Sequence, residues 1–492
     1  MTSVYPHILN TVLPGALRLT RSRFLSRARQ MSRRQFWSRE QLKAWQHDRL
    51  CQLLTHAYER VALYRTAFDE FDLAPDDFKC VEDLRRFPVL TKDAVRANFP
   101  DRMLATGCKP GDCQYVGSGG TTNRVMVLHD FQRRDVGLST DLMTYAEDAP
   151  FRLGQRQVCI PPDECSVHCG TEKRQQVSLL ARLRSAGARK WFARDTASDL
   201  RGILMDQWIR RATVLPPLYT TEPEEVTENC REAIEAIKRL RPTMLVALPE
   251  YLRDLAHTIH QDQAVLPPLK VVRPMGANLP AAWKPNIESA FRCPLREHYG
   301  ARETGGMAFD CRCRNGLHIL SDQVAIEVEW DGRPAEEGEL GSILVTDLNN
   351  FATPLIRYRI GDLGRIDYTE CPCGRSTPRL VLEGRECDAI GGPDRLVSSE
   401  EVANVLYQRH RIDRFQLVQS QDGSLAFKMI DAAHDECRDD VAQTLRDLFP
   451  AARRIRIRTV SHIAPEASGK FRCCKAAQQR IRISAGLNAS LG

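Results

Sequence analysis

The sequence predicts an α/β protein that is divided into several domains. With 492 residues, the chain is too long for one compact core. Helix-like and strand-like segments alternate between residues 222 and 272, which is typical of an α/β architecture. We expect a basic helical extension over residues 1–70, a large domain with a β-rich subdomain over 71–384, and a small α+β domain over 385–492.

Three helices are predicted from capping residues and apolar spacing. Ser38 and Gln41 form a capping-box pattern that opens a long helix. Thr91 is a good N-cap for a second helix. A third helix should run from Glu222 to Leu240, because proline at position 242 disfavours helix in the residue before it. The buried stripe of the first helix should consist of Leu50, Leu53, Leu54, Ala57, Tyr58 and Val61.

Short apolar or alternating runs predict the strands and define the β-rich region. Turn residues separate these runs, as expected for strands. A further helix pair, Ser399 to Arg409 and Asp435 to Leu448, completes the small α+β domain. The predicted strands are 244–248, 269–272, 324–330, 343–346, 365–368, 380–382, 415–419, 425–430 and 454–460, with a strand–loop–strand unit over 115–127.

The composition is that of an ordinary globular protein, with 42% hydrophobic and 27% charged residues. The net charge of +7 is modest and gives no reason to expect a nucleic-acid partner. The 17 cysteines are scattered and odd in number, which favours reduced thiols and metal ligation over a disulfide framework. No run approaches the ~20 apolar residues of a membrane-spanning helix. We therefore expect a cytoplasmic protein, as a monomer or homodimer.

The first 39 residues contain no Asp or Glu, whereas arginines crowd positions 18 to 39. Apolar residues such as Phe24, Ala28 and Met31 are interleaved with these arginines. One interpretation is a basic amphipathic helix that makes peripheral contact with an anionic membrane. The alternatives are a helical arm docked on its own domain, with a solvated arginine face, and a targeting peptide.

Three thiols and an imidazole form a candidate zinc site. Cys311 and His318 lie near each other in the sequence, and Cys371 and Cys373 follow in a second segment. Cysteine and histidine suit tetrahedral zinc, and a site filled by four protein ligands is structural. The alternative is a set of free core cysteines around a β-hairpin. A second group, Cys159, Cys165, His168 and Cys169, fits no metal-site template and is interpreted as buried or loop residues.

A glycine-rich loop is the first candidate for phosphate binding. It reads Gly117-Ser118-Gly119-Gly120-Thr121-Thr122. Glycines allow close approach of the backbone to an anion, and hydroxyls and N–H groups can cradle phosphate oxygens. The loop lacks the Gly-Lys-Ser/Thr ending of a P-loop. Taken alone, it is equally consistent with a plain glycine-rich hairpin.

Further motifs follow this loop in a characteristic order. They are Phe87 to Lys92, Tyr299-Gly300-Ala301-Arg302-Glu303, Gly316-Leu317-His318 with Asp322, Pro354 to Asp362, Cys371 to Arg375, Gly384-Arg385 and Gly469-Lys470. Together they resemble the adenylate-forming superfamily of acyl- and aryl-CoA ligases. More narrowly, they resemble the phenylacetate–CoA ligase family, in the branch associated with capsular polysaccharide clusters. The resemblance spans nearly the whole chain and implies the adenylate-forming fold, with a mobile small C-terminal domain.

The resemblance implies a role for each matching residue. Ser118, Gly119, Gly120, Thr121 and Thr122 correspond to the flexible loop that orders over ATP. Gly276, Tyr299 and Gly300 match positions that wall the adenine, and Asp362 matches the carboxylate that binds the ribose hydroxyls. Glu303 matches the residue that holds Mg²⁺. Arg385 lies near the nucleotide, and Lys470 bridges the carboxylate and the α-phosphate. Cys311, His318, Cys371 and Cys373 match a zinc-ligand set.

These matches imply an ATP-dependent, AMP-forming ligase. It would activate a carboxylic acid as an acyl-adenylate and transfer the acyl group to a thiol, with coenzyme A as the default acceptor. Two departures leave alternatives open. Arg302 replaces a threonine and is a candidate catalytic residue, and Asn123 and Val125 replace the usual glycine and proline of the phosphate loop. The alternatives are an amide-forming ligase with an amine acceptor and a degenerate nucleotide-binding protein without turnover.

Overall fold

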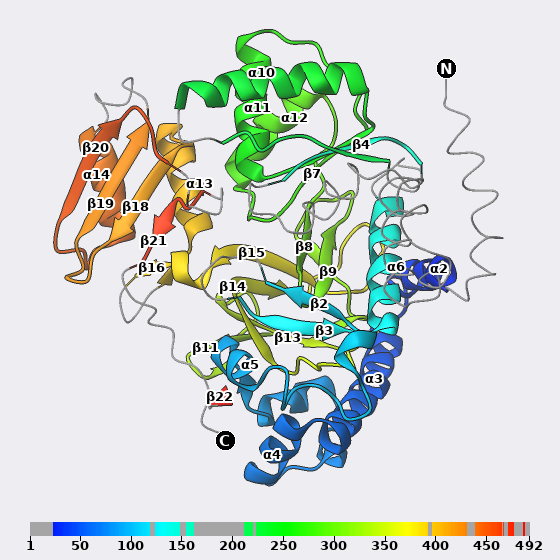
Figure 1. Ribbon diagram of the computed structural model, residues 1–492. Helices are drawn as coiled ribbons and strands as arrows, with labels where there is room; N and C mark the ends of the chain where they lie inside the picture. Colours follow the sequence, from blue (N-terminus) through cyan, green and yellow to red (C-terminus); the bar gives the residue numbers. More distant parts are fainter. Residues whose placement is uncertain are drawn as a thin grey trace.

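The computed structural model places the C-terminal part of the chain beside the larger N-terminal part (Figure 1). Within the described residues, no helix is long and apolar enough to cross a membrane. The buried apolar side chains form three main clusters, one for the N-terminal helices and the largest sheet, one for the α/β layer and one for the C-terminal part. The residues described are 23–118, 124–147, 154–161, 211–219, 223–391, 396–430, 438–464, 466, 471–476 and 486–487.

The N-terminal helices confirm the predicted capping residues. The Ser38 side chain accepts from the backbone of Gln41, and the Gln41 side chain accepts from the backbone of Ser38. The Thr91 side chain caps its helix by accepting a hydrogen bond from the backbone N–H of Ala94. The predicted stripe is buried, except that Tyr58 is only partly buried. The helices are α2 (Phe24–Arg34), α3 (Arg39–Arg60), α4 (Ala62–Glu70) and α5 (Lys92–Asn98), with 3-10 turns η1 (Pro75–Asp77), η2 (Val81–Arg86) and η3 (Pro110–Asp112).

Helix α2 is docked on the protein itself. Phe24, Ala28 and Met31 are buried, and the latter two pack against α6 (Phe131–Glu147). Figure 1 shows the two helices side by side. The structure therefore agrees with the alternative of a docked arm for this helix, because Phe24, Ala28 and Met31 are covered by the protein itself. Residues 1–22 lie outside the described part of the chain.

The α/β layer is a parallel sheet covered by helices, as predicted from the alternating pattern. Its strand order is β5-β4-β6-β7. Tyr251, Leu252 and Leu255 of α11 are fully buried against this sheet. The elements are β4 (Gln157–Ile160), β5 (Ala212–Val214), α10 (Pro223–Leu240), β6 (Met244–Ala247), α11 (Pro249–Gln261), β7 (Val271–Pro274), η6 (Ala281–Trp283) and α12 (Lys284–Phe291).

The largest sheet runs in the order β12-β11-β13-β14-β15-β10-β9-β8. A separate hairpin, β2–β3, carries the glycine-rich loop between its strands. The strands are β1 (Val89–Leu90), β2 (Gln114–Gly117), β3 (Met126–His129), β8 (His298–Ala301), β9 (Gly305–Asp310), β10 (Leu317–Ile319), β11 (Val324–Trp330), β12 (Arg333–Pro334), β13 (Gly341–Asp347), β14 (Tyr358–Asp367) and β15 (Arg379–Arg385).

The C-terminal part is α+β, with a four-stranded sheet in the order β20-β19-β18-β21. Its own core includes Phe415, Phe427 and Leu445. The domain limits at residues 70 and 384 remain proposals, since α3 and α4 already contribute to the core of the large sheet. The elements are η7 (Glu386–Asp388), β16 (Ile390–Gly391), β17 (Leu396–Val397), α13 (Ser399–His410), β18 (Phe415–Gln419), β19 (Leu425–Ile430), α14 (Arg438–Leu448), β20 (Ile455–Val460), β21 (Cys474–Lys475) and β22 (Gly486–Leu487).

Strand β22 lies apart from the rest of the C-terminal part. It pairs in parallel with β1, so Gly486 lies opposite Val89 and Leu487 opposite Leu90. Figure 1 shows it near α5, away from the four-stranded sheet of the small domain. The far end of the chain therefore returns to the large sheet, which the sequence pattern did not predict.

Candidate active site

Three predicted nucleotide-binding residues contact one another across the large sheet. Asp362 on β14 lies opposite Arg385 on β15 in the antiparallel ladder. One carboxylate oxygen of Asp362 lies 3.0 Å from Nε of Arg385, and the other accepts a hydrogen bond of 2.8 Å from the Tyr299 hydroxyl. Asp362 raises the pKa of Arg385. Burial and the same carboxylate raise the pKa of Tyr299, so its hydroxyl is a donor at neutral pH.

Lys92 adds a cation to this group. Gly361 has a φ of +85°, and a Cβ on it would lie 2.9 Å from Nζ of Lys92. The left-handed backbone favours glycine here, and any side chain at this position would also have to displace the ammonium of Lys92. Burial, followed by the charge of Arg385, lowers the pKa of Lys92, whereas Asp362 and Glu303 act to raise it. Lys92 thus lies in the field of both predicted site carboxylates.

Glu303 lies in the turn between β8 and β9 and is only 3% exposed. Its carboxylate accepts a hydrogen bond of 3.2 Å from the Tyr358 hydroxyl, and burial raises the pKa of that hydroxyl. The imidazole of His129 lies 3.0 Å from the backbone oxygen of Glu303. Burial, followed by the charge of Arg133, lowers the pKa of His129 to about 3. The neutral imidazole therefore acts as the hydrogen-bond donor to this carbonyl.

Arg133 on α6 supports the same turn from behind. Its Nε donates to Asp347 over 2.6 Å, and both side chains are almost completely buried. A second guanidinium nitrogen donates to the backbone oxygen of Thr304. A Cβ on Gly305 would lie 2.8 Å from this guanidinium, so glycine is needed there. The turn that carries Glu303 is therefore fixed by a buried ion pair.

The ends of the glycine-rich loop are held together. Ser118 donates its backbone N–H to the oxygen of Val125 over 2.8 Å, and its hydroxyl accepts from the N–H of Val125 over 2.9 Å. Val125 is fully buried, although it replaces the proline of the family pattern. The predicted phosphate-loop residues Gly119, Gly120, Thr121 and Thr122 lie outside the described residues.

Two further predicted glycines have clear steric reasons. A Cβ on Gly300 would lie 2.5 Å from the backbone oxygen of Gly305, so glycine lets β8 and β9 approach. Gly276 has a φ of +79° in the loop after β7. Arg302 is half-buried in the turn beside Glu303. The backbone geometry thus gives a reason for glycine at both positions, 276 and 300.

The segment Glu386–Asp388, at the start of the predicted mobile domain, is bound by a residue close to the predicted catalytic lysine. Lys470 itself lies outside the described residues. Arg472 donates from Nε to Asp388 over 2.6 Å and from a terminal guanidinium nitrogen to the backbone oxygen of Cys387 over 3.1 Å. Burial raises the pKa of Asp388, and Arg472 acts against this rise. The segment after Lys470 therefore contacts the start of the small domain directly.

The four predicted metal ligands form one cluster. The ligand atoms of Cys311, His318, Cys371 and Cys373 all lie within 4.8 Å of one another. The Sγ atoms of Cys311 and Cys371 are 3.6 Å apart, and Sγ of Cys373 lies 3.3 Å from Nε2 of His318. Thiolates at ~2.3 Å from a tetrahedral zinc would be about 3.8 Å apart. The donor set and its spacing therefore fit zinc, and Cys313 is exposed outside it.

Hydrogen bonds from residues around the four ligands orient the ligand side chains of this cluster. Nδ1 of His318 lies 3.1 Å from the backbone oxygen of Thr377, which leaves Nε2 directed at the thiols. Burial lowers the pKa of His318 to about 4 and raises that of Cys311 to about 11. Burial acts to raise the pKa of Cys373 as well, but hydrogen bonds from Arg375 outweigh it and the pKa is lowered. His318 is thus neutral at pH 7, as a metal ligand must be.

The second cysteine group shows no comparable arrangement among its described members. Cys159 is buried in β4, and its thiol lies 3.8 Å from the sulfur of Met275. This agrees with the interpretation of Cys159 as a core residue. Cys165, His168 and Cys169 lie outside the described residues.

Sequence reasoning missed three residues that support the site. His129 and Arg133 lie outside every motif of the sequence analysis, and Lys92 enters it only as the last residue of the Phe87 to Lys92 motif. No local pattern marks these residues, because the fold brings them to Glu303 and Asp362 from segments 170 or more residues away. Tyr358 had a usable signal, since it lies in the Pro354 to Asp362 motif.

Comparison with known proteins agrees with the family resemblance that the sequence motifs predict. Residues 218–352 match the family of AMP-binding enzymes. Phenylacetate-coenzyme A ligase of Thermus thermophilus is 26% identical over 398 residues, which cover 79% of this chain and 80% of that protein. Phenylacetate-coenzyme A ligase of Escherichia coli is also 26% identical, over 70% of this chain and 74% of that protein.

Solved structures show the same fold. A 2-hydroxyisobutyryl-CoA ligase in its postadenylation state superposes with a TM-score of 0.67 at 19% identity, covering 91% of this chain and 92% of that one. An anthranilate CoA ligase with anthranoyl-AMP superposes with a TM-score of 0.50 at 15% identity, covering 75% of this chain and 67% of that one. The predicted adenylate-forming fold is therefore confirmed.

These relatives agree with the order of motifs along the chain and with the fold. The narrower branch associated with capsular polysaccharide clusters is a prediction that they do not test. The match to AMP-binding enzymes and the similarity to these relatives support the predicted resemblance to the adenylate-forming superfamily and, within it, to the phenylacetate–CoA ligase family.

Proposed function

We propose that this AMP-forming carboxylate ligase activates a carboxylic acid with ATP and then transfers the acyl group to the thiol of coenzyme A. The observation that carries the proposal is the Asp362 carboxylate, which the Tyr299 hydroxyl and Arg385 hold from two sides. A fixed bidentate acceptor suits the two hydroxyls of a ribose. Each residue role below is part of this proposal.

In the first step the nucleotide would lie over β8, β14 and the glycine-rich loop. Gly276, Tyr299 and Gly300 would wall the adenine, and Asp362 would bind the ribose. The loop from Ser118 to Thr122, with Gly119, Gly120 and Thr121, would cover the phosphates. The steric need for glycine at positions 276 and 300 supports these backbone roles.

The chemistry brings two anions together, because a carboxylate attacks the α-phosphate. A Mg²⁺ ion would supply positive charge at the phosphates, and Glu303 is the residue proposed to hold it. Lys470 would add the countercharge that stabilises the transition state, and Arg302 would lie at the same end of the site. The burial of Glu303 and its neutral donor Tyr358 support a carboxylate kept in one orientation.

The second step requires coenzyme A to reach the adenylate. We propose that the small domain rotates at the segment Glu386–Asp388, next to Arg385. The contacts of Arg472 with Cys387 and Asp388 support this location, since they join the segment after Lys470 to the hinge. Rotation would then move Lys470 out of the site and let the thiol approach.

The cysteine–histidine cluster is proposed to hold one structural zinc. Four protein ligands leave no open position for substrate, so the metal would not take part in the reaction. It would join the turn after β9 to the connection between β14 and β15. Arg375 supports this arrangement, because its guanidinium lies 5.0 Å from the ring of Phe36 and 5.3 Å from that of Phe309.

A pyrophosphate-exchange assay tests the proposed function. The wild-type enzyme should exchange pyrophosphate into ATP in the presence of its acid, and a set of aryl and alkyl acids would identify that acid. Lys470→Ala should bind ATP normally and lose most of the exchange. Asp362→Ala should weaken ATP binding itself. Normal exchange by Lys470→Ala with the true acid would contradict the assigned mechanism.

The same assay addresses the two alternatives. Coenzyme A and an amine can be offered to the preformed adenylate, and only a thioester should accumulate if the proposed acceptor is right. Arg302→Thr separates a working ligase from a degenerate nucleotide-binding protein. Reduced turnover would support a role of Arg302 at the phosphates. Activity that appears only in this variant would mean that the natural protein is not a working ligase.

A further inference from the structure

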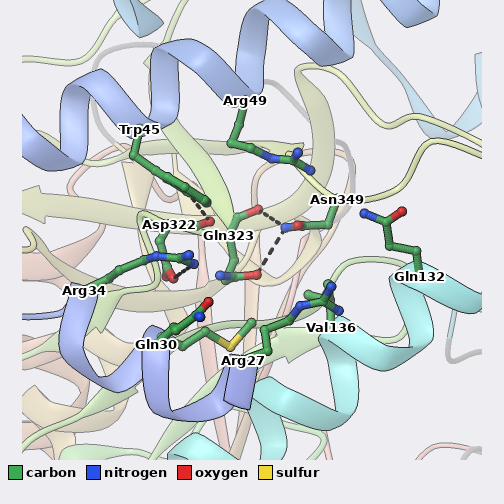
Figure 2. A pocket seen from close by; sticks show the side chains of 11 residues that line it. Arg27, Gln30, Arg34, Trp45, Arg49, Gln132, Val136, Asp322, Gln323 and Asn349 are labelled. Atoms are coloured by element: carbon green, nitrogen blue, oxygen red, sulfur yellow. Dashed lines mark hydrogen bonds and ion pairs between the residues drawn. The ribbon is translucent and has the colours of Figure 1, made fainter. Parts of the chain in front are cut away.

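A second polar cavity lies away from the nucleotide site, between α2, α3 and α6. Its volume is about 200 Å³. We call it the arginine pocket, because Arg27, Arg34 and Arg49 line it together (Figure 2). Asp322, Gln323 and Asn349 close its floor, and Gln30, Met31, Trp45, Gln132 and Val136 complete its walls. The proposed nucleotide-binding and metal-binding residues are not among those that line it.

Two of the three arginines have carboxylate partners. Arg27 lies 3.0 Å from a carboxylate oxygen of Asp135, and Arg34 lies 3.4 Å from Asp322. The guanidinium of Arg34 is also stacked 3.9 Å from the centre of the Trp45 ring. These contacts hold both side chains in place at the edge of the cavity, with Asp322 completely buried.

Arg49 is the arginine of the pocket that has no carboxylate within ion-pair distance among the described residues, and the nearby Asp347 is already paired with Arg133. It donates to the backbone oxygen of Leu348 over 2.9 Å and to the amide oxygen of Gln52 over 2.8 Å. Both acceptors are neutral, and no carboxylate contact of Arg49 is found among the described residues. Burial, followed by the charge of Arg27, lowers the pKa of Arg49, whereas the carboxylate of Asp347 acts to raise it. The pocket therefore carries excess positive charge that an anion would relieve.

We propose that the arginine pocket binds one small oxyanion, a phosphate or a carboxylate, through Arg49 with the help of Arg27 and Arg34. Guanidinium groups match such planar or tetrahedral oxygen arrays better than they match chloride. Because Arg27 and Arg34 are already paired, Arg49 supplies the net charge and the affinity depends mainly on it.

The uncharged glutamine side chains in the wall of the arginine pocket suggest a ligand with a short polar group beside its anionic end. Gln30 and Gln132 reach into the cavity from two different helices, and Figure 2 shows Gln132 pointing from α6 towards Asn349. A cavity of 150 Å³ holds a molecule about the size of benzene. At about 200 Å³ the arginine pocket has room for inorganic phosphate or for a small hydroxylated acid or monophosphate, but not for a nucleotide triphosphate.

Such an anion would bridge three helices and the turn at Asp322. Arg34 and Gln35 both contact Asp322, which follows β10, the strand that carries His318. An occupied pocket would therefore hold α2 against the large domain more firmly. The expected result is higher stability on anion binding.

Thermal unfolding and calorimetry of the full-length protein test the proposal. Sodium phosphate, methyl phosphate, acetate and succinate are titrated against sodium chloride at equal ionic strength. At least one of the four should give a saturable rise in Tm of about 1 °C or more and one bound anion per chain. The comparison of the phosphate arms with the carboxylate arms identifies the preferred oxyanion.

Two variants connect the response to the pocket. Arg49→Gln should weaken the preferred anion at least about tenfold, because a charge-assisted donor is lost. Gln132→Glu places a carboxylate within the pocket, so it should raise the Tm of the anion-free protein and abolish the response. Gln408→Glu adds the same charge on the exposed surface of α13 and should change neither.

The proposal is overturned by either of two results. One is the absence of a saturable response to all four anions in the wild-type protein. The other is an unchanged response in Gln132→Glu, which would place the bound anion elsewhere. If Arg49→Gln fails to fold, Gln132→Glu still decides, because it keeps all three arginines.

Discussion

Tyr299→Phe tests whether the Asp362 carboxylate is the ribose-binding group. The substitution keeps the aromatic ring and removes only the hydroxyl that donates to Asp362 over 2.8 Å. A hydrogen bond to a charged group contributes about 1.5–3 kcal/mol. Arg385 still holds the other carboxylate oxygen, so we expect a loss near the lower end of this range. That loss corresponds to about tenfold weaker ATP binding.

The assay is calorimetric titration of both proteins with ATP and with 2′-deoxy-ATP. The wild-type protein should bind ATP more tightly than the deoxy nucleotide, and Tyr299→Phe should reduce this difference because the carboxylate is less well oriented. Tyr64→Phe is the matched control. Its buried hydroxyl donates to the oxygen of Pro354, so its loss should lower Tm without changing ATP affinity. Equal binding of ATP and 2′-deoxy-ATP by the wild-type protein would refute the role given to Asp362.

Three further predictions concern the framework of the site. Cys371→Ser should lower the zinc content from about one per chain and should reduce Tm. Cys313→Ser should change neither quantity, because Cys313 is exposed outside the cluster. Elemental analysis measures the zinc content, and thermal unfolding measures Tm. Glu400 of α13 accepts hydrogen bonds of 2.8 Å from the side chain of Asn278 and from the backbone of the same loop, and burial raises its pKa to about 7. The folded protein then binds the proton of Glu400 more tightly than the unfolded chain does. As the pH rises from 4.5 to 7, the free energy of unfolding should therefore fall by at most about 3 kcal/mol relative to that of Glu400→Gln, and it should level off above pH 7. Denaturant titrations measure both proteins, and parallel pH curves would contradict this prediction. Arg133→Met should cost about 3–5 kcal/mol of unfolding free energy, because it leaves a buried carboxylate without its partner; a loss below about 1 kcal/mol would show that the pair does not stabilise the fold.

Local patterning predicted elements well wherever the pattern had clear ends. The strands 324–330, 415–419 and 425–430 have the predicted limits, because alternating residues are bounded by turn residues on both sides. The first half of β14 was missed. Gly361 adopts a positive φ within the strand, and its sequence neighbourhood therefore resembles a loop although the ladder continues through Asp362.

The sequence did not predict the tertiary contacts that support the site. His129 touches the backbone of Glu303, and Lys92 lies beside Gly361, yet neither contact leaves a local pattern in the chain. The metal cluster was predicted because its donors are chemically distinctive even when 60 residues separate Cys311 from Cys371. Distinctive chemistry is thus visible in the sequence, whereas supporting contacts made by common residues are not.

The supporting contacts also explain why the substitution at position 302 is compatible with a working site. His129 and Arg133 hold the turn through the backbone oxygens of Glu303 and Thr304, which every side chain leaves in place. These two contacts therefore do not require a particular side chain at residue 302. In the proposed site, Arg302→Thr removes a positive charge beside the phosphates while these two backbone hydrogen bonds remain, so its activity tests the role proposed for Arg302.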